Sequence, residues 1–197
     1  MRYGALMDGA QHFDDGLFLM STAEASAMDP QQRLLLERGY DALHRAGLTK
    51  IELLGSTAGG NGGQWASEFG SLEGSAAACS VYSSTGHACS VTCGRLSFAL
   101  GLQGPCASFD TACSASLVAL HRSMRALQRN ESGLALSAGV NMMLSRAAMQ
   151  GNAIAGFSSV AGRSHTFDAR ADGYARGEAV VAMVGRVRGM GLPQHSG

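Results

Sequence analysis

The sequence has no net charge and no long hydrophobic run. Its 197 residues contain 15 lysines and arginines against 15 aspartates and glutamates, so the formal net charge at neutral pH is zero. A neutral chain gives no electrostatic reason to expect nucleic acid or an acidic membrane surface as a partner. No stretch approaches the roughly 18 apolar residues that a membrane-spanning helix needs. We therefore expect neither nucleic acid nor a membrane as a partner.

Paired cysteines and a recognisable leader are also missing. The five cysteines are an odd number without paired spacing, which argues against a secreted disulfide framework. They are Cys79, Cys89, Cys93, Cys106 and Cys113. Cys89 and Cys93 show C-x3-C spacing instead of the repeated C-x2-C of zinc sites, so we predict no metal site. Asp8 and Asp14 interrupt the start, unlike a signal peptide. We expect a cytoplasmic protein, and a plastid location stays open if a transit peptide precedes Met1.

The composition is that of a globular domain, and one helix has clear signals at both ends. Hydrophobic residues make up 46% and charged residues 15% of the chain, whose length allows one domain with a substantial core. A helix is predicted over residues 29–47. Asp29 is its expected N-cap, Pro30 suits the first helical position, and Gln32 is expected to close a capping box. Gly47 is the expected C′ stop.

Strands and helices alternate in the second half of the chain. A short strand is predicted at 106–110, a helix from about 114 to 128, and further strands at 134–140 and 179–187. This alternation predicts a layered α/β fold. The predicted buried face of the helix consists of Leu117, Leu120, Met124 and Leu127.

A glycine-rich stretch at 55–63 invites comparison with a phosphate-binding loop. However, no Gly-Lys-Ser/Thr follows it, and no Gly-x-Gly-x-x-Gly opens a helix there. We therefore interpret it as a flexible connection, and we expect residues 59–63 to be irregular or a poor strand. Residues 75–93 are small and polar without a clear period, and the sequence assigns them no element.

Cys113 lies in the segment DTACSAS at 110–116, where the predicted strand meets the predicted helix. A helix N-terminus carries partial positive charge and unpaired N–H groups, which favour a thiolate over a thiol. The small neighbours of Cys113 leave room for a substrate carbonyl, and its own N–H can serve as one arm of an oxyanion hole. These features suit a cysteine that accepts an acyl group as a thioester. A buried, inert cysteine fits the local residues equally well.

A cysteine nucleophile also needs a group that handles protons, and no histidine is clearly placed to do so. His121 is the nearest in sequence, but along the same helix it lies roughly 12 Å from Cys113. The remaining histidines stand in no recognisable catalytic pattern: His12, His44, His87, His165 and His195.

Five blocks of sequence occur in a distinctive order. They are MDPQQRLLLE at 28–37, GRLSF at 94–98, GLQGP at 101–105, DTACSASLVALH at 110–121 and FDARADGYARGE at 167–178. Together they resemble the hallmarks of the β-ketoacyl synthases of polyketide and fatty-acid synthesis, and the block at 110–121 resembles the active-site signature of that family. Several blocks in family order are far more specific than one motif. The resemblance assigns residues 1–188 to the N-terminal half of a ketosynthase domain, with 189–197 as an unmatched tail.

The resemblance implies a thiolase-like layered α/β fold, normally in a homodimer. It also implies a decarboxylative Claisen condensation, with Cys113 as the nucleophile by position. An acyl chain passes from the phosphopantetheine thiol of an acyl carrier protein to the cysteine. A carrier-linked malonyl unit then loses carbon dioxide and attacks that thioester. The substrates are thus carried by the partner, and no bound cofactor is expected.

This sequence also departs from the family pattern. The family has a second half with two catalytic histidines and a lysine, and none of their motifs occurs before Gly197. Asn61 and its neighbouring glycines stand where the family usually has an apolar strand, and Ala179 replaces a glycine. We therefore expect these 197 residues alone to be incomplete for full condensation. The alternatives are a non-catalytic ketosynthase remnant or dimerisation module, and a thiol acceptor that is loaded at Cys113 but cannot condense.

Overall fold

The computed structural model describes residues 4–72 and 80–187, so the tail at 189–197, Cys79 and part of the unassigned 75–93 segment lie outside the described residues. One mixed sheet has the strand order β2-β1-β3-β4. β1 pairs in parallel with both β2 and β3, and β4 pairs antiparallel with β3. The strands are β1 (Gly59–Gln64), β2 (Cys106–Phe109), β3 (Leu134–Asn141) and β4 (Ala179–Arg186). The three strands predicted after residue 100 are confirmed.

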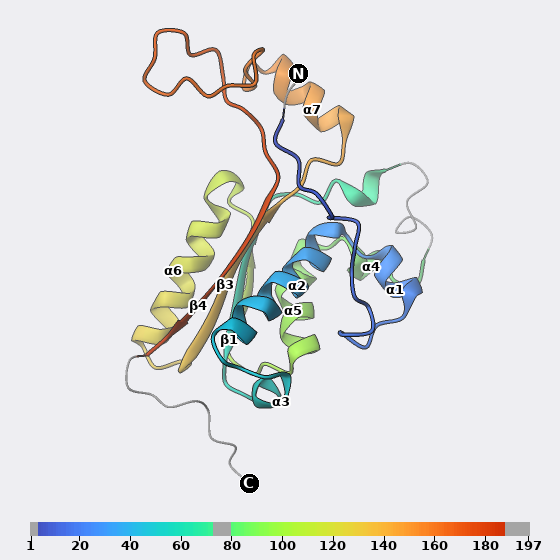
Figure 1. The fold of residues 1–197 in the computed structure, drawn as a ribbon, viewed down its shortest axis with the longest axis vertical. Coiled ribbons are helices and arrows are strands. Elements are labelled where there is room, and N and C mark those ends of the chain that lie inside the picture. Colours follow the sequence, from blue (N-terminus) through green and yellow to red (C-terminus); the bar gives the residue numbers. More distant parts are fainter. Residues whose placement is uncertain (1–3, 73–79, 188–197) are drawn as a thin grey trace.

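Helices cover both faces of the sheet. Figure 1 shows α6 (Ala115–Gln128) on one side and α2 (Pro30–Arg45) with α5 (Cys89–Leu100) on the other. The shorter elements are α1 (Thr22–Ala27), α3 (Lys50–Leu53), η1 (Phe69–Ser71), α4 (Ser83–Gly86), the 3-10 turn η3 (Ala112–Ser114) and α7 (Arg146–Ile154). Within residues 4–72 and 80–187, no helix is both long and apolar enough to cross a membrane.

The two ends of α2 follow from the sequence, except for the capping box. The Asp29 carboxylate accepts a hydrogen bond of 2.7 Å from the backbone N–H of Gln31, as an N-cap should. Gly47 adopts a φ of +86° just past the helix, where a residue with a Cβ would be strained. The expected capping box is wrong, because the Gln32 side chain bonds to other elements and not to the N-cap.

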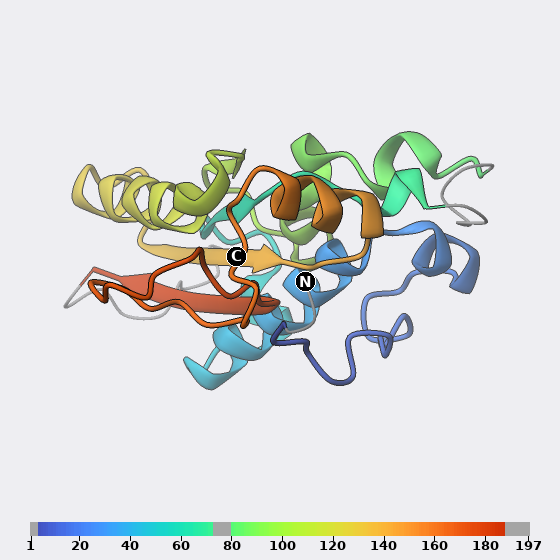
Figure 2. The ribbon, with the colours of Figure 1, turned by 90° about the horizontal axis from the view of Figure 1, so that it is seen from above.

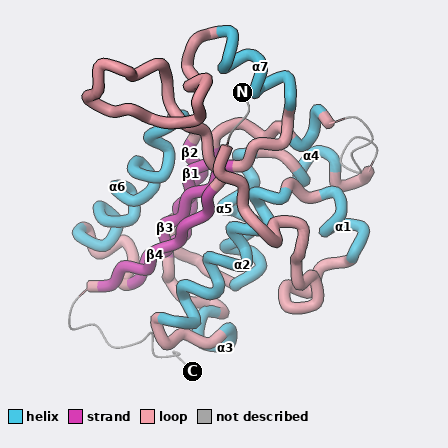
Figure 3. Tube along the Cα trace, turned by 45° about the horizontal axis from the view of Figure 1, so that its top comes forward, coloured by secondary structure: helices cyan, strands magenta, loops and turns pink. Residues whose placement is uncertain are grey.

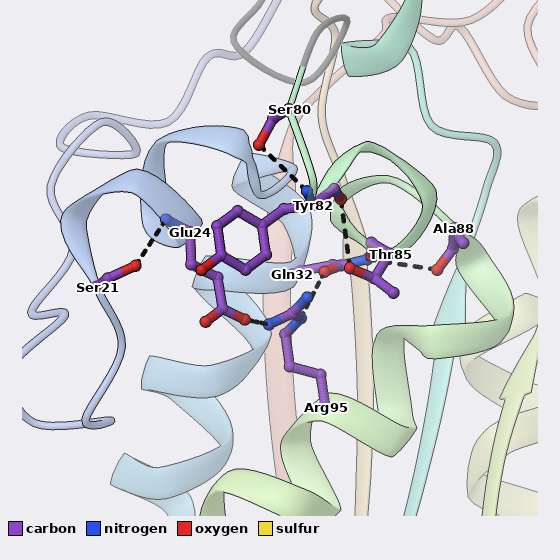
Figure 4. A network of polar contacts seen from close by, with 8 residues as sticks. All are labelled: Ser21, Glu24, Gln32, Ser80, Tyr82, Thr85, Ala88 and Arg95. Atoms are coloured by element: carbon purple, nitrogen blue, oxygen red, sulfur yellow. Dashed lines mark hydrogen bonds and ion pairs between the residues drawn. The ribbon is translucent and has the colours of Figure 1, made fainter.

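Gln32 belongs to a polar network that joins four helices (Figure 4). Its amide nitrogen donates to the carbonyl oxygens of Thr85 and Ala88, at 3.2 and 3.3 Å. Nε of the buried Arg95 donates to the amide oxygen of Gln32 at 3.0 Å, and Arg95 also forms an ion pair with Glu24. These long-range hydrogen bonds stabilise α4 and the start of α5. The local sequence of small polar residues does not predict these two elements.

The glycine-rich segment is a central strand, so the predicted flexible connection is wrong. β1 is buried along its whole length, with β2 and β3 on its two sides. Close packing on both faces explains the glycines. A Cβ at Gly62 would lie 2.6 Å from Sγ of Cys93 in α5, and one at Gly63 would lie 2.3 Å from the backbone of Ala115 in α6. Two helices approach the strand so closely that side chains would not fit.

The buried face of α6 also differs from the prediction. Its buried residues are the small Ala115, Ala119, Ser123 and Ala126. The predicted Leu117 and Met124 are 66% and 50% exposed, and Leu120 and Leu127 are only partly buried. The physical reason is that α6 lies directly on the glycines of β1, where the short distance between helix and strand leaves room only for small side chains. A buried hydrogen bond of 3.0 Å from the Asn61 amide to the Ser123 hydroxyl fixes this contact.

Candidate active site

The carboxyl ends of β1, β2 and β3 meet at one edge of the sheet, and Cys113 lies there. β2 ends at Phe109, and Cys113 follows within the turn η3 that leads into α6. Ala112 adopts a φ of +52°, in the left-handed region, and the amide of Ala112 donates to the Asp110 carboxylate at 3.2 Å. This tight, strained connection turns the chain from strand to helix within a few residues.

Two glycines allow the first turn of α6 to lie directly on the sheet. A Cβ at Gly63 would lie 2.3 Å from the carbonyl carbon of Ala115. A Cβ at Gly139, on the neighbouring strand β3, would lie 2.5 Å from the Cβ of Ser116. Because neither strand has a side chain at these points, the start of α6 and with it Cys113 are fixed against the sheet.

The predicted position of Cys113 at the N-terminal end of a helix, directly after a strand, is confirmed. The strand itself is an edge strand with partly exposed residues, not the buried strand we expected. The Cys113 side chain is exposed and lines a cavity of about 610 Å³. The alternative of a buried Cys113 is therefore wrong, and the reactivity of the thiol stays a prediction.

The other described cysteines lie in different surroundings. Burial raises the pKa of Cys93 to about 12, despite the hydrogen bond from the Ser108 side chain, which lowers it. Burial and the nearby Asp110 carboxylate raise the pKa of Cys89. Both residues therefore remain thiols near neutral pH. Cys106 is exposed in β2 and does not line the Cys113 cavity.

No histidine is found among the described residues that line the Cys113 cavity. His121 is exposed on α6 and does not line the cavity, in agreement with its predicted distance from Cys113 along the helix. His87 ends α4 with its ring against Gly70, and its buried Nδ1 has no hydrogen-bond partner in the described chain. His165 lies in the loop before β4, beside Asp172. Within residues 4–72 and 80–187, no imidazole therefore lies at the cavity.

The sequence assigned no individual role to the other residues of this cavity, although Tyr174 and Arg176 lie in the block at 167–178. Trp65 follows β1, Asn141 ends β3, and Phe157, Tyr174 and Arg176 come from the loop that connects α7 to β4. Figure 3 shows this loop at the end of the molecule where α6 begins, and Figure 2 shows the loop and α7 lying over the end of the sheet. Trp65 and Asn141 could have been predicted from their positions at the ends of parallel strands, since residues at such positions meet at one edge of the sheet.

Backbone bonds hold the long loop in place over the cavity. The amide of Tyr174 donates to the carbonyl of Phe157 at 2.9 Å, and the amide of Ser159 donates to the carbonyl of Tyr174 at 3.0 Å. Gly173 between them has a φ of +135°, and a Cβ there would lie 2.6 Å from the Ser159 nitrogen. Glu178 then accepts bonds of 2.9 Å from the amides of Met7 and Met143, which fixes the start of β4. The loop residues that line the cavity are therefore held by hydrogen bonds of the backbone.

Comparison with known proteins agrees with this geometry. The family model for the β-ketoacyl synthase N-terminal domain matches residues 1–186. The chain belongs to the β-ketoacyl synthase family. It is 44% identical over 178 residues to polyketide synthase GfsA of Streptomyces halstedii, covering 90% of this chain and 2% of that protein. It is 38% identical over 183 residues to the mycocerosic acid synthase-like polyketide synthase of Mycolicibacterium smegmatis, covering 92% and 9%.

Solved ketosynthases share the fold of this β-ketoacyl synthase domain. The ketosynthase from module 6 of the bacillaene synthase of Bacillus subtilis 168 superposes with a TM-score of 0.83 at 32% identity, over 92% of this chain and 31% of that one. The oxazolomycin ketosynthase domain OzmH KS7 of Streptomyces albus JA3453 gives a TM-score of 0.82 at 29% identity, over 94% and 33%. The predicted thiolase-like layered α/β fold is confirmed, and the chain spans about a third of each of these ketosynthases.

Proposed function

We propose that Cys113 accepts an acyl group from a carrier-linked thioester, as the first half-reaction of a polyketide or fatty-acid ketosynthase. The observation that supports this most is the exposed thiol at the start of α6, facing a cavity of about 610 Å³. The sulfur attacks the thioester carbonyl, a new carbon–sulfur bond forms, and the bond to the carrier thiol breaks. The proton of Cys113 leaves with the carrier thiol.

The second half-reaction needs groups beyond the described cavity. A malonyl unit on an acyl carrier protein would lose carbon dioxide, and the resulting carbanion would attack the acyl carbon and release the cysteine sulfur. No imidazole of the described chain lines the cavity to assist this step. We therefore propose that this chain alone is loaded at Cys113 and that the acyl-enzyme then persists.

Acylation of the intact chain tests the proposal. Incubation with a short acyl-pantetheine thioester should add one acyl group, and peptide mass spectrometry should locate it on Cys113. Cys113→Ala should abolish the adduct. Cys106→Ala is the matched control, because Cys106 is also exposed but lies outside the cavity. Equal acylation of both cysteines would contradict the proposal, and release of β-ketoacyl product would refute the expected stall.

A second candidate function is that of an assembly module that dimerises without catalysis. The apolar Leu117 and Met124 are exposed on the outer face of α6, and β2 is an edge strand of the sheet with a neighbour on one side only. Exposed apolar surface and a free strand edge both favour a protein partner, with a second copy of this chain the simplest one. If the chain dimerises but Cys113 resists acylation, this second function is the better description.

A further inference from the structure

Arg176 is a buried cation without an acidic partner in the described chain. The residue is only 6% exposed, yet no carboxylate of residues 4–72 or 80–187 forms an ion pair with its guanidinium group. Its Nη1 is buried without a hydrogen-bond partner there. Arg95 is the instructive contrast: at 9% exposure it has both Glu24 and Gln32 as partners (Figure 4).

The surroundings of Arg176 favour an anionic ligand. An unpaired charge taken out of water is costly, and the indole face of Trp65, 5.5 Å from the guanidinium carbon, compensates only part of that cost. Arg176 lines the same cavity as Cys113. Most of the other lining groups are apolar, among them Phe157 and Val140, so an ion pair formed there is weakly screened.

We propose that Arg176 binds the carboxylate of a malonyl-type thioester whose thioester group faces Cys113. This inference rests on the proposed function of the cavity, and it concerns binding, with no bond made or broken. The malonyl carboxylate is joined to the carbon next to the thioester carbonyl, so a cavity that holds the thioester at Cys113 must also hold the carboxylate. The phosphate of the carrier arm, by contrast, is separated from the thioester by the whole pantetheine chain. A guanidinium can hold a carboxylate through two parallel N–H bonds.

The experiment uses pantetheine amides, in which nitrogen replaces the thioester sulfur and acyl transfer cannot occur. A malonyl amide and an acetyl amide, which differ by the carboxylate, are titrated as protectants of Cys113 against iodoacetamide. The intact chain should be half-protected by the malonyl amide at a concentration about tenfold or more below that of the acetyl amide, because bonds to charged groups are stronger than neutral ones. Arg176→Gln should remove this preference, and Arg176→Lys should restore part of it.

Arg170→Gln is the matched control, since Arg170 lies in the same loop but is exposed and paired with Asp168. It should keep the preference for the malonyl amide. Circular dichroism melting of each variant establishes that it is folded. An unchanged preference in Arg176→Gln, or equal protection by both amides in the parent chain, would overturn the proposal. If Arg176→Gln weakens the protection of Cys113 only when the amides carry the 4′-phosphate, Arg176 binds that phosphate and not the malonyl carboxylate. Because the amides cannot acylate, these outcomes are independent of whether acyl thioesters load Cys113.

Discussion

Cys93 lies in α5 and Cys113 lies just before α6, two helices on opposite faces of the sheet, and the two thiols have different surroundings. Cys93 in α5 is packed over Gly62, and burial raises its pKa to about 12. Cys113 is exposed at the start of α6, next to the unpaired amides of a helix N-terminus. One thiol is therefore packed in the interior, and the other is accessible to reagents.

We expect Cys113 to be the first cysteine alkylated in the native chain. At pH 7.5 and limiting iodoacetamide, it should react about tenfold faster than Cys106, which is exposed within strand β2 and not at the start of a helix. Cys93 should remain unmodified until the protein is unfolded. Time-resolved peptide mass spectrometry measures the rates. Uniform labelling of all exposed and buried thiols would mean that the site is not organised.

The buried Cys93 should make stability depend on pH in the alkaline range. Its pKa is raised in the folded state from 9.0 to about 12, so the folded protein retains the proton that the unfolded chain loses. The contribution is therefore fully present below about pH 9 and is lost as the pH rises towards 12. Between pH 8 and 10.5 the free energy of unfolding should fall by about 2 kcal/mol from this residue.

Urea denaturation at the two pH values measures this effect. Cys93→Ala should lose the corresponding part of the pH dependence, whatever its effect on stability at pH 8. Cys106→Ala is the matched control and should behave as the parent chain does. An identical alkaline slope in the parent and in Cys93→Ala would contradict the assigned burial.

At the scale of elements, the glycines of β1 determine how closely α5 and α6 approach the sheet. Gly62 faces α5 through Cys93, and Gly63 faces α6 through Ala115. The two contacts differ in kind, because the first is with a side-chain sulfur and the second is with backbone. Only the first can be relieved by a second substitution.

Gly62→Ala should destabilise the chain by about 1–3 kcal/mol, because its Cβ would overlap Sγ of Cys93 at 2.6 Å. Adding Cys93→Ala removes that sulfur and should recover most of the loss, which a double-mutant cycle in urea measures. Gly94→Ala is the control: Gly94 lies within α5 with no atom within 4 Å of its Cβ, and the change should stabilise by about 0.5–1 kcal/mol. Additive effects of the first two substitutions would show that they do not meet.

Gly63→Ala should not be rescued in this way. Its Cβ would lie 2.3 Å from the backbone of Ala115, so the first turn of α6 must move and carry Cys113 with it. We expect the selective alkylation of Cys113 to be lost even under conditions where the variant stays folded by circular dichroism. Retained selectivity would mean that the glycine contact does not position the cysteine.

These contacts also explain which elements could be predicted from the sequence. The end of α2 at Gly47 and the place of Cys113 depend on local signals, namely a stop glycine and a strand followed by a periodic helix. β1 could not be recognised from its own residues, because its glycines fit the helices that lie on it and show no apolar pattern; only the family resemblance placed a strand there. The same applies to α6: the large apolar residues predicted the wrong buried face, because the helix buries its small residues against the glycines. Trp65 and Arg176 meet only through the folded sheet edge.

At the scale of the whole molecule, apolar surface remains exposed around the outer face of α6. Leu117 and Met124, seven residues apart on this helix, are exposed there. Large apolar side chains left on a surface favour contact with another surface. The chain spans 31% of the module 6 ketosynthase that it matches, so a longer polypeptide or a second copy can supply that surface.

The isolated chain should therefore associate with itself through α6. Each large apolar side chain removed from water contributes roughly 1.5–3 kcal/mol, and every 1.4 kcal/mol is about a factor of ten in Kd. Leu117→Gln combined with Met124→Gln should thus weaken association by at least about tenfold in sedimentation equilibrium. Ile51→Gln is the matched control, because Ile51 is also exposed but lies on α3, away from α6. If the control weakens association as much as the α6 double variant does, the association is non-specific and hydrophobic, and α6 is not the interface. If only the α6 variant dissociates while Cys113 keeps its alkylation rate, assembly and thiol chemistry are separate properties of the same helix.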